Sequence, residues 1–189
     1  MIRAFIAIDL PDDVRAALGE AQARLKRAHV GVKVSWTKVH NIHVTLQFLG
    51  YMEEEAIDKI RKSLESVAQQ HFKFDIRVHG AGGFPNERSP RVLWVGCGDP
   101  EGKLKTLAGA VQTAMQPLGF EPEHREFSAH LTLGRVKQPR PDAALTKALD
   151  SIKNQAFGTL RVAAIHLFES KLHPEGSIYT KLSSHALQD

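Results

Sequence analysis

His43-Val44-Thr45-Leu46 and His130-Leu131-Thr132-Leu133 repeat one pattern: a histidine, an apolar residue, a threonine and a second apolar residue. The two histidines lie 87 positions apart in a chain of 189 residues, close to half its length. Each copy lies in a segment typical of a β-strand, where side chains alternate between two faces. The histidine and threonine of a copy therefore share one face. Chance placement predicts roughly 0.07 such patterns, so two copies indicate a duplicated functional element.

The segments around the two copies predict an α+β fold. Strand-like and helix-like segments interleave, but neighbouring strands also follow each other directly, which favours antiparallel sheets. A helix is expected to begin at Pro11 and to carry apolar residues up to Leu25, and the glycines and prolines of 80–90 predict a loop. Further helices are predicted over 53–70, 100–117 and 142–154, and strands over 2–9, 32–36, 42–49, 72–79, 91–97, 127–136, 160–170 and 177–183. Two similar lobes facing each other would bring both copies into one cleft.

Composition limits the class of protein. Apolar residues make up 42% of the chain, enough for a core, and 189 residues suit a single unit of two packed lobes. The only cysteine, Cys97, lies at the end of an apolar strand. We expect it to be a small buried apolar side chain rather than a nucleophile. The apolar run of the first residues is too short for a signal peptide, and no segment is long enough to span a bilayer. We expect a cytoplasmic monomer.

Two histidines suit proton transfer near neutral pH, because an unperturbed imidazole has a pKa of about 6.5. At a phosphorus centre, one neutral imidazole can take a proton from attacking water while a protonated one gives a proton to the departing oxygen. From the residues alone the two roles are interchangeable. Threonine hydroxyls can donate hydrogen bonds to the phosphoryl oxygens. This chemistry requires no metal ion and no cofactor.

Other catalytic sites fit the sequence less well. A zinc site usually has three protein ligands, but segments 41–50 and 127–137 contain no aspartate or glutamate. The chain has no Gly-x-Ser-x-Gly element for a serine nucleophile and no phosphate-binding P-loop. The formal net charge of +4 permits an anionic substrate, but it is too small to indicate binding of long duplex nucleic acid.

The paired motifs resemble those of the two-histidine (2H) phosphoesterase superfamily. Flanking stretches are similar to the bacterial and archaeal RNA 2′,3′-cyclic phosphodiesterases, also called 2′-5′ RNA ligases, and the resemblance extends from residue 3 to about residue 182. The common family form has a proline before the second histidine, where this chain has Ala129. The stretches that carry the resemblance are 3–11, 41–50, 90–96, 127–136 and 167–172.

The resemblance implies a bilobal fold, each lobe an antiparallel sheet backed by helices, with the active site in the cleft between them. It implies opening of a 2′,3′-cyclic phosphate at an RNA 3′ end to leave a 2′-phosphate, without a metal. His43 would donate a proton to the departing 3′-oxygen and His130 would accept one from water. Thr45 and Thr132 would hold the phosphate.

Three aromatic residues and one arginine have less defined roles. Arg135 lies at an odd offset from His130, so a regular strand would turn it away from the cleft; the resemblance implies that it helps to bind substrate, which a locally bent strand would allow. Phe84 and Tyr179 are candidates for stacking on a base. The same alternation predicts that Phe48 faces the core.

Three further functions remain open from the sequence. A 2′-5′ RNA ligase would run the reverse reaction with an RNA 5′-hydroxyl as nucleophile, at the same site. A 2′-5′ oligonucleotide phosphodiesterase would act on 2′-5′-linked oligonucleotides. A non-catalytic module could bind RNA ends, although a binder has no need of a proton-transfer pair. RNA 3′ ends with a cyclic phosphate, such as those of cleaved tRNA, are the expected partners.

Overall fold

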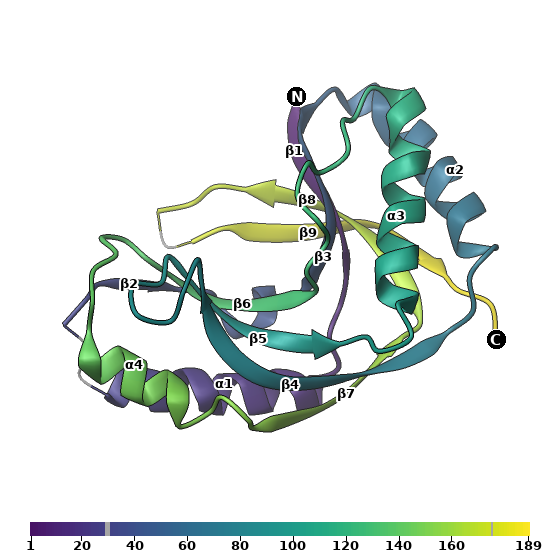
Figure 1. Cartoon of the computed structure of the whole chain (residues 1–189). Coiled ribbons are helices and arrows are strands. Elements are labelled where there is room, and N and C mark those ends of the chain that lie inside the picture. The colour runs from purple at the N-terminus through teal and green to yellow at the C-terminus, as the bar shows by residue number, and fades with distance from the viewer. Residues whose placement is uncertain (29–30, 175) are drawn as a thin grey trace.

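The computed structural model describes residues 1–28, 31–174 and 176–189 (Figure 1). Over these residues the chain forms nine β-strands, four α-helices and three short 3₁₀-helices. In chain order they are β1 (Ile2–Ile8), α1 (Asp12–Arg27), β2 (Val34–Trp36), η1 (Val39–Asn41), β3 (Val44–Met52), η2 (Glu54–Ala56), α2 (Ile57–Ala68), β4 (Phe74–Phe84), β5 (Val92–Gly98), α3 (Lys103–Met115), η3 (Gln116–Leu118), β6 (His130–Val136), α4 (Ala143–Asp150), β7 (Ala156–Val162), β8 (Ala164–Lys171) and β9 (Ile178–Ala186).

The strands form two antiparallel halves of one sheet, in the order β7-β4-β5-β6-β3-β1-β8-β9, with β2 beside β6. The halves meet where β3 pairs with β6 through a single residue pair, Val44 with Leu131. We call β3, β1, β8 and β9 the first lobe, and β6, β5, β4, β7 and β2 the second lobe. The two motif strands are therefore the innermost strands, and the predicted bilobal α+β fold is confirmed.

The helices are exchanged between the two halves of the chain. Helices α2 and α3 pack together against the first lobe, whereas α1 and α4 pack together against the second lobe (Figure 1). Helix α1 precedes the first motif in sequence but covers the lobe of the second motif. Helix α3 precedes the second motif but covers the lobe of the first motif. Each lobe is thus completed by the other half of the chain.

Each helix buries one apolar stripe against its sheet, as the 3.6-residue period requires. Helix α2 buries Ile60, Leu64 and Val67, and α3 buries Leu104, Leu107 and Val111. The short helix α4 begins at Asp142, whose side chain accepts a hydrogen bond of 2.9 Å from the Leu145 amide. None of the helices in the described part of the chain is long and apolar enough to cross a membrane.

The predicted loop over 80–90 is partly wrong, because β4 continues to Phe84. Gly82 pairs with Trp94 and Gly83 with Leu93. A Cβ atom on Gly82 would lie 2.6 Å from the Trp94 ring. This glycine therefore leaves room for an aromatic ring within a strand, where the sequence suggested a turn.

Several element boundaries also differ. The single strand predicted over 160–170 is two strands, β7 at one edge of the sheet order and β8 next to the other edge, so the count is nine rather than eight. The helix predicted over 142–154 ends at Asp150, and turns follow it. The helix predicted over 53–70 begins as the 3₁₀-helix η2, and the one predicted over 100–117 is confined to α3.

Candidate active site

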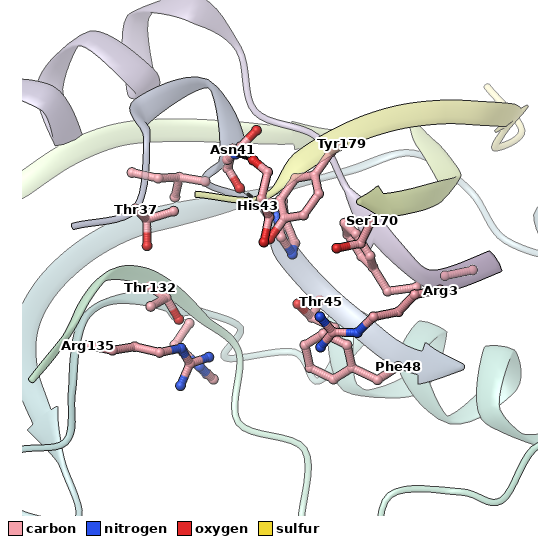
Figure 2. A pocket seen from close by; sticks show the side chains of 15 residues that line it. Arg3, Thr37, Asn41, His43, Thr45, Phe48, Thr132, Arg135, Ser170 and Tyr179 are labelled. Carbon is pink, nitrogen blue, oxygen red and sulfur yellow. Dashed lines mark hydrogen bonds between the residues drawn. The ribbon is translucent and has the colours of Figure 1, made fainter. Parts of the chain in front are cut away.

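The two motifs face one pocket of about 320 Å³ at the junction of the lobes (Figure 2). Val44 and Leu131 are fully buried on the core side. Two histidines and two threonines line the pocket: His43, Thr45, His130 and Thr132.

Both imidazoles are held by the same hydrogen bond. Nδ1 of His43 lies 2.7 Å from the carbonyl oxygen of Asn41, and Nδ1 of His130 lies 2.7 Å from that of Ser128. A carbonyl oxygen only accepts, so each Nδ1 carries the proton. Nε2 is then the ring atom that can exchange a proton with a ligand in the pocket.

The two imidazoles have different surroundings. The Phe5 ring stacks on His43 at 4.6 Å between centroids, and the edge of Tyr179 approaches it at 5.5 Å. Burial among these rings lowers the pKa of His43 below 6.5, although the Asn41 carbonyl and Asp9 act in the opposite direction.

Each motif strand contains a bulge at the third residue after its histidine. Between Thr45, which pairs with Ala7, and Gln47, which pairs with Ile6, Leu46 has no partner. Leu133 is skipped in the same way between Thr132 and Gly134 as β6 pairs with β5. An extra residue reverses the alternation of faces along the rest of the strand.

The bulges turn the fifth residue after each histidine into the pocket. These residues are Phe48 and Arg135, and both line it. The prediction that Phe48 faces the core is wrong, because its side chain is 52% exposed. Arg135 lines the pocket because the bulge bends its strand locally.

A glutamine from an exchanged helix supports each bulge. Gln22 of α1 is buried, and its Nε2 donates to the carbonyl oxygens of Leu133 and Thr37, each at 2.7 Å. Gln112 of α3 donates to the carbonyl of Leu46 at 3.3 Å. The carbonyl of each bulged residue thus receives a hydrogen bond from the helix that the other half of the chain supplies.

The pocket is cationic. Arg3 and Arg135 line it from opposite lobes, and its described lining residues include no aspartate or glutamate. Sequence reasoning missed Arg3, although it shares a face of the regular strand β1 with Phe5. It also missed four polar residues of the lining, Thr37, Asn41, Ser170 and Ser177.

The two proposed stacking residues lie in different places. Tyr179 lines the pocket beside His43. Phe84 is not among the lining residues; its ring stacks on Trp94 at 5.1 Å and meets His130 edge-on at 5.2 Å. Phe84 therefore packs against the His130 ring outside the pocket lining. A base in the pocket would contact Tyr179 or Phe48 first.

Other reactive groups are poorly placed for catalysis. Burial raises the pKa of the Cys97 thiol to about 12, so it stays protonated at neutral pH. Within the ranges that the structure describes, no three histidine, cysteine or acidic side chains are grouped closely enough to hold a metal ion.

Two interleaved lobes, each presenting a His-x-Thr pair to a common cationic pocket, define a two-histidine phosphoesterase. The chain belongs to the LigT-like phosphoesterase family, whose model matches it twice, over residues 8–94 and 95–179. The two matches place one motif in each half of the chain.

Similar proteins share nearly the whole length of the chain. An RNA 2′,3′-cyclic phosphodiesterase of Archaeoglobus fulgidus is 38% identical, covering 96% of this chain and 98% of its own. One from Methanothermobacter thermautotrophicus is 35% identical, covering 96% of both chains. Among solved structures, TT0787 of Thermus thermophilus has a TM-score of 0.81 at 30% identity and covers 98% of both chains. Escherichia coli LigT complexed with 3′-AMP has a TM-score of 0.77 at 25% identity, covering 100% of this chain and 99% of its own.

Proposed function

We propose that this protein hydrolyses the 2′,3′-cyclic phosphate at an RNA 3′ end to a 2′-phosphate. The observation that carries the proposal is the pair of imidazoles, both fixed through Nδ1, beside a cationic pocket. The names of the relatives, RNA 2′,3′-cyclic phosphodiesterase, support the same substrate.

In the proposed mechanism, Nε2 of His130 takes a proton from water as the water oxygen attacks phosphorus. The bond between phosphorus and the 3′-oxygen breaks, and Nε2 of protonated His43 gives its proton to that oxygen. The hydroxyls of Thr45 and Thr132 and the Arg135 guanidinium donate to the non-bridging oxygens, where negative charge develops. Water adds across the ring ester, so a 2′-phosphate and a 3′-hydroxyl result.

The low pKa of His43 fits the role of acid. Its imidazolium gives up a proton more readily than an ordinary one, and the negative charge of a bound phosphate raises the protonated fraction. The exposed ring of Phe48 is placed to stack on the terminal base, with Tyr179 on the other side of Thr45 along the pocket (Figure 2).

The direct test is to incubate a short RNA ending in a 2′,3′-cyclic phosphate with the protein in EDTA and to determine the position of the product phosphate. We expect a 2′-phosphate, with turnover lost in His43→Ala and in His130→Ala while RNA binding is retained. A 3′-phosphate would reverse the leaving group, and binding without turnover by the parent protein would favour an RNA-end binding module.

A substrate with sulfur in place of the bridging 3′-oxygen would separate the two histidines. A thiolate leaves without a proton, so this substrate needs a base but no acid. We expect His43→Ala to recover most of its activity on the sulfur substrate and His130→Ala to stay inactive. The opposite pattern would exchange the two roles.

The same site could run the reverse reaction, in which an RNA 5′-hydroxyl replaces water and forms a 2′-5′ linkage. Supplying an RNA with a 5′-hydroxyl in the same assay detects this activity as a longer product. We further propose that the chain acts as a single unit and a monomer in the cytoplasm, on RNA ends that include those of cleaved tRNA.

A further inference from the structure

A second bulge extends the pocket face of β3 beyond Phe48. Phe48 pairs with Phe5 and Gly50 pairs with Ala4, so Leu49 has no partner on β1. Gly50 adopts a φ of 72°, a conformation that favours glycine and suits this bulge. The alternation of side chains between the two faces of β3 therefore shifts again, and Tyr51 is the next residue on the pocket side.

Tyr51 and Arg3 lie side by side on this face. They are paired across β3 and β1, and paired residues project from the same side of a sheet. Arg3 lines the pocket, so Tyr51 borders it, and the Tyr51 side chain is 67% exposed. From the centre of the pocket outward, His43 just before β3 is therefore followed on this face by Thr45, Phe48 and Tyr51.

Among the residues that the structure describes, Arg3 has no charged partner. No aspartate or glutamate of the described residues lies within ion-pair distance of it, and the described pocket lining is free of carboxylates. Figure 2 shows Arg3 beside Phe48 and Ser170, while Arg135 lies across the pocket with Thr132. The pocket therefore has two separate guanidinium groups, which match two separate anionic groups of a ligand.

We propose that Arg3 and Tyr51 form a subsite for the nucleotide that precedes the reacting one. Arg3 binds the phosphate that joins the two nucleotides, and the upstream base stacks on Tyr51. This inference rests on the proposed function, which assigns the cyclic phosphate to Arg135 and the terminal base to Phe48. Two aromatic side chains along β3, with a cation beside them on β1, form the kind of surface that binds single-stranded RNA.

Three substrates of increasing length test the subsite: adenosine 2′,3′-cyclic phosphate, the same nucleoside with a 5′-phosphate, and the dinucleotide ApA with a terminal 2′,3′-cyclic phosphate. We expect kcat/KM to rise roughly 10-fold or more when the 5′-phosphate is added, because a charge-assisted hydrogen bond is gained. The upstream base should add roughly 5-fold or more through stacking.

Each variant should remove one step of this series. Arg3→Gln should bring the kcat/KM ratio between the phosphorylated and unphosphorylated nucleosides close to 1. Tyr51→Ala should reduce only the gain from the upstream base, and Tyr51→Phe should keep it. Arg27→Gln removes the same charge from the exposed end of α1, behind the second lobe, and should leave both ratios as in the parent protein.

The outcomes separate the subsite from the reaction itself. Equal kcat/KM on all three substrates, or ratios unchanged by Arg3→Gln and Tyr51→Ala, would overturn the subsite and leave the cyclic phosphodiesterase intact. A change in preference between adenine and guanine nucleosides, without a change in the phosphate ratio, would make Arg3 a reader of the base edge and would also overturn it. Failure on every substrate would instead refute the proposed function.

Discussion

The two motif histidines are chemically identical but lie in unequal surroundings. His43 is enclosed by Phe5 and Tyr179, whereas His130 meets the edge of one ring, that of Phe84. Both have the same Nδ1 bond to a carbonyl two residues before them, so that bond fixes tautomer and orientation without distinguishing them. Apolar packing around His43 supplies the difference that the proposed acid–base pair requires.

Removing Tyr179 should expose His43 and raise its pKa. Burial is the main cause that holds this pKa below 6.5, and Tyr179→Ala admits water beside the ring. NMR titration of the imidazole carbon resonances should show the His43 midpoint moving up toward 6.5. Phe84→Ala serves as the matched control beside His130 and should not move the His43 midpoint. A His43 midpoint that stays in place in Tyr179→Ala would contradict the assigned cause.

The pH dependence of kcat/KM should follow from the same asymmetry. The reaction needs one imidazole protonated and the other neutral, so activity falls on both sides of an optimum. The acidic limb of this bell lies at the lower of the two pKa values of the histidine pair, whichever histidine has it. Because the pKa of His43 is lowered, this limb should lie below pH 6.5. Steady-state rates in EDTA across pH 5 to 9 measure it. A flat profile would exclude two titrating histidines.

At the scale of elements, the bulges in β3 and β6 decide which side chains enter the pocket. Their carbonyls are held by Gln112 and Gln22, from helices that the opposite halves of the chain provide. Without the bulges, regular alternation would return Phe48 and Arg135 to the core side. The two glutamines are therefore expected to stabilise both the fold and the geometry of the site.

Gln22→Leu should be the more costly of two matched substitutions. It removes the donor to two carbonyl oxygens at 2.7 Å, one of them buried, whereas Gln112→Leu removes one bond of 3.3 Å. We expect Gln22→Leu to lower the free energy of unfolding by about 1–3 kcal/mol and Gln112→Leu by less, measured by urea denaturation. Gln70→Leu, at an exposed position in the turn after α2, should change it by less than about 0.5 kcal/mol. Equal effects of all three would show that the bulges need no such support.

Local patterns in the sequence predicted the motif strands and helices, because alternation and 3.6-residue periodicity are properties of a few neighbouring residues. They could not predict the bulges, which depend on pairing with β1 and β5 and on distant glutamines. That is why Phe48 was assigned to the core and Arg135 could be placed only by resemblance. The misplaced strand over 160–170 has the same origin: β7 and β8 follow each other directly in sequence, yet five strands separate them in the sheet order.

At the scale of the whole molecule, the exchange of α1 and α3 makes each lobe depend on both halves of the chain. The site lies where β3 and β6 meet, and only one residue pair joins those strands directly. The relative position of the two imidazoles must therefore be maintained largely by the helices and by chain connections that cross between lobes. This arrangement predicts that the lobes do not unfold separately.

Unfolding should accordingly be a single transition, although the molecule has two lobes. Trp36 and Trp94 both belong to the second lobe, in β2 and β5, so tryptophan fluorescence reports on that lobe alone. Far-UV circular dichroism reports on both lobes, because each contributes strands and helices. We expect the two signals to give coincident urea denaturation curves, since the chain crosses repeatedly between the lobes and each lobe contains segments from both halves of the chain. If fluorescence changed at a different urea concentration from circular dichroism, the lobes would be independent units. The geometry of the site would then have to be maintained by the β3–β6 contact alone.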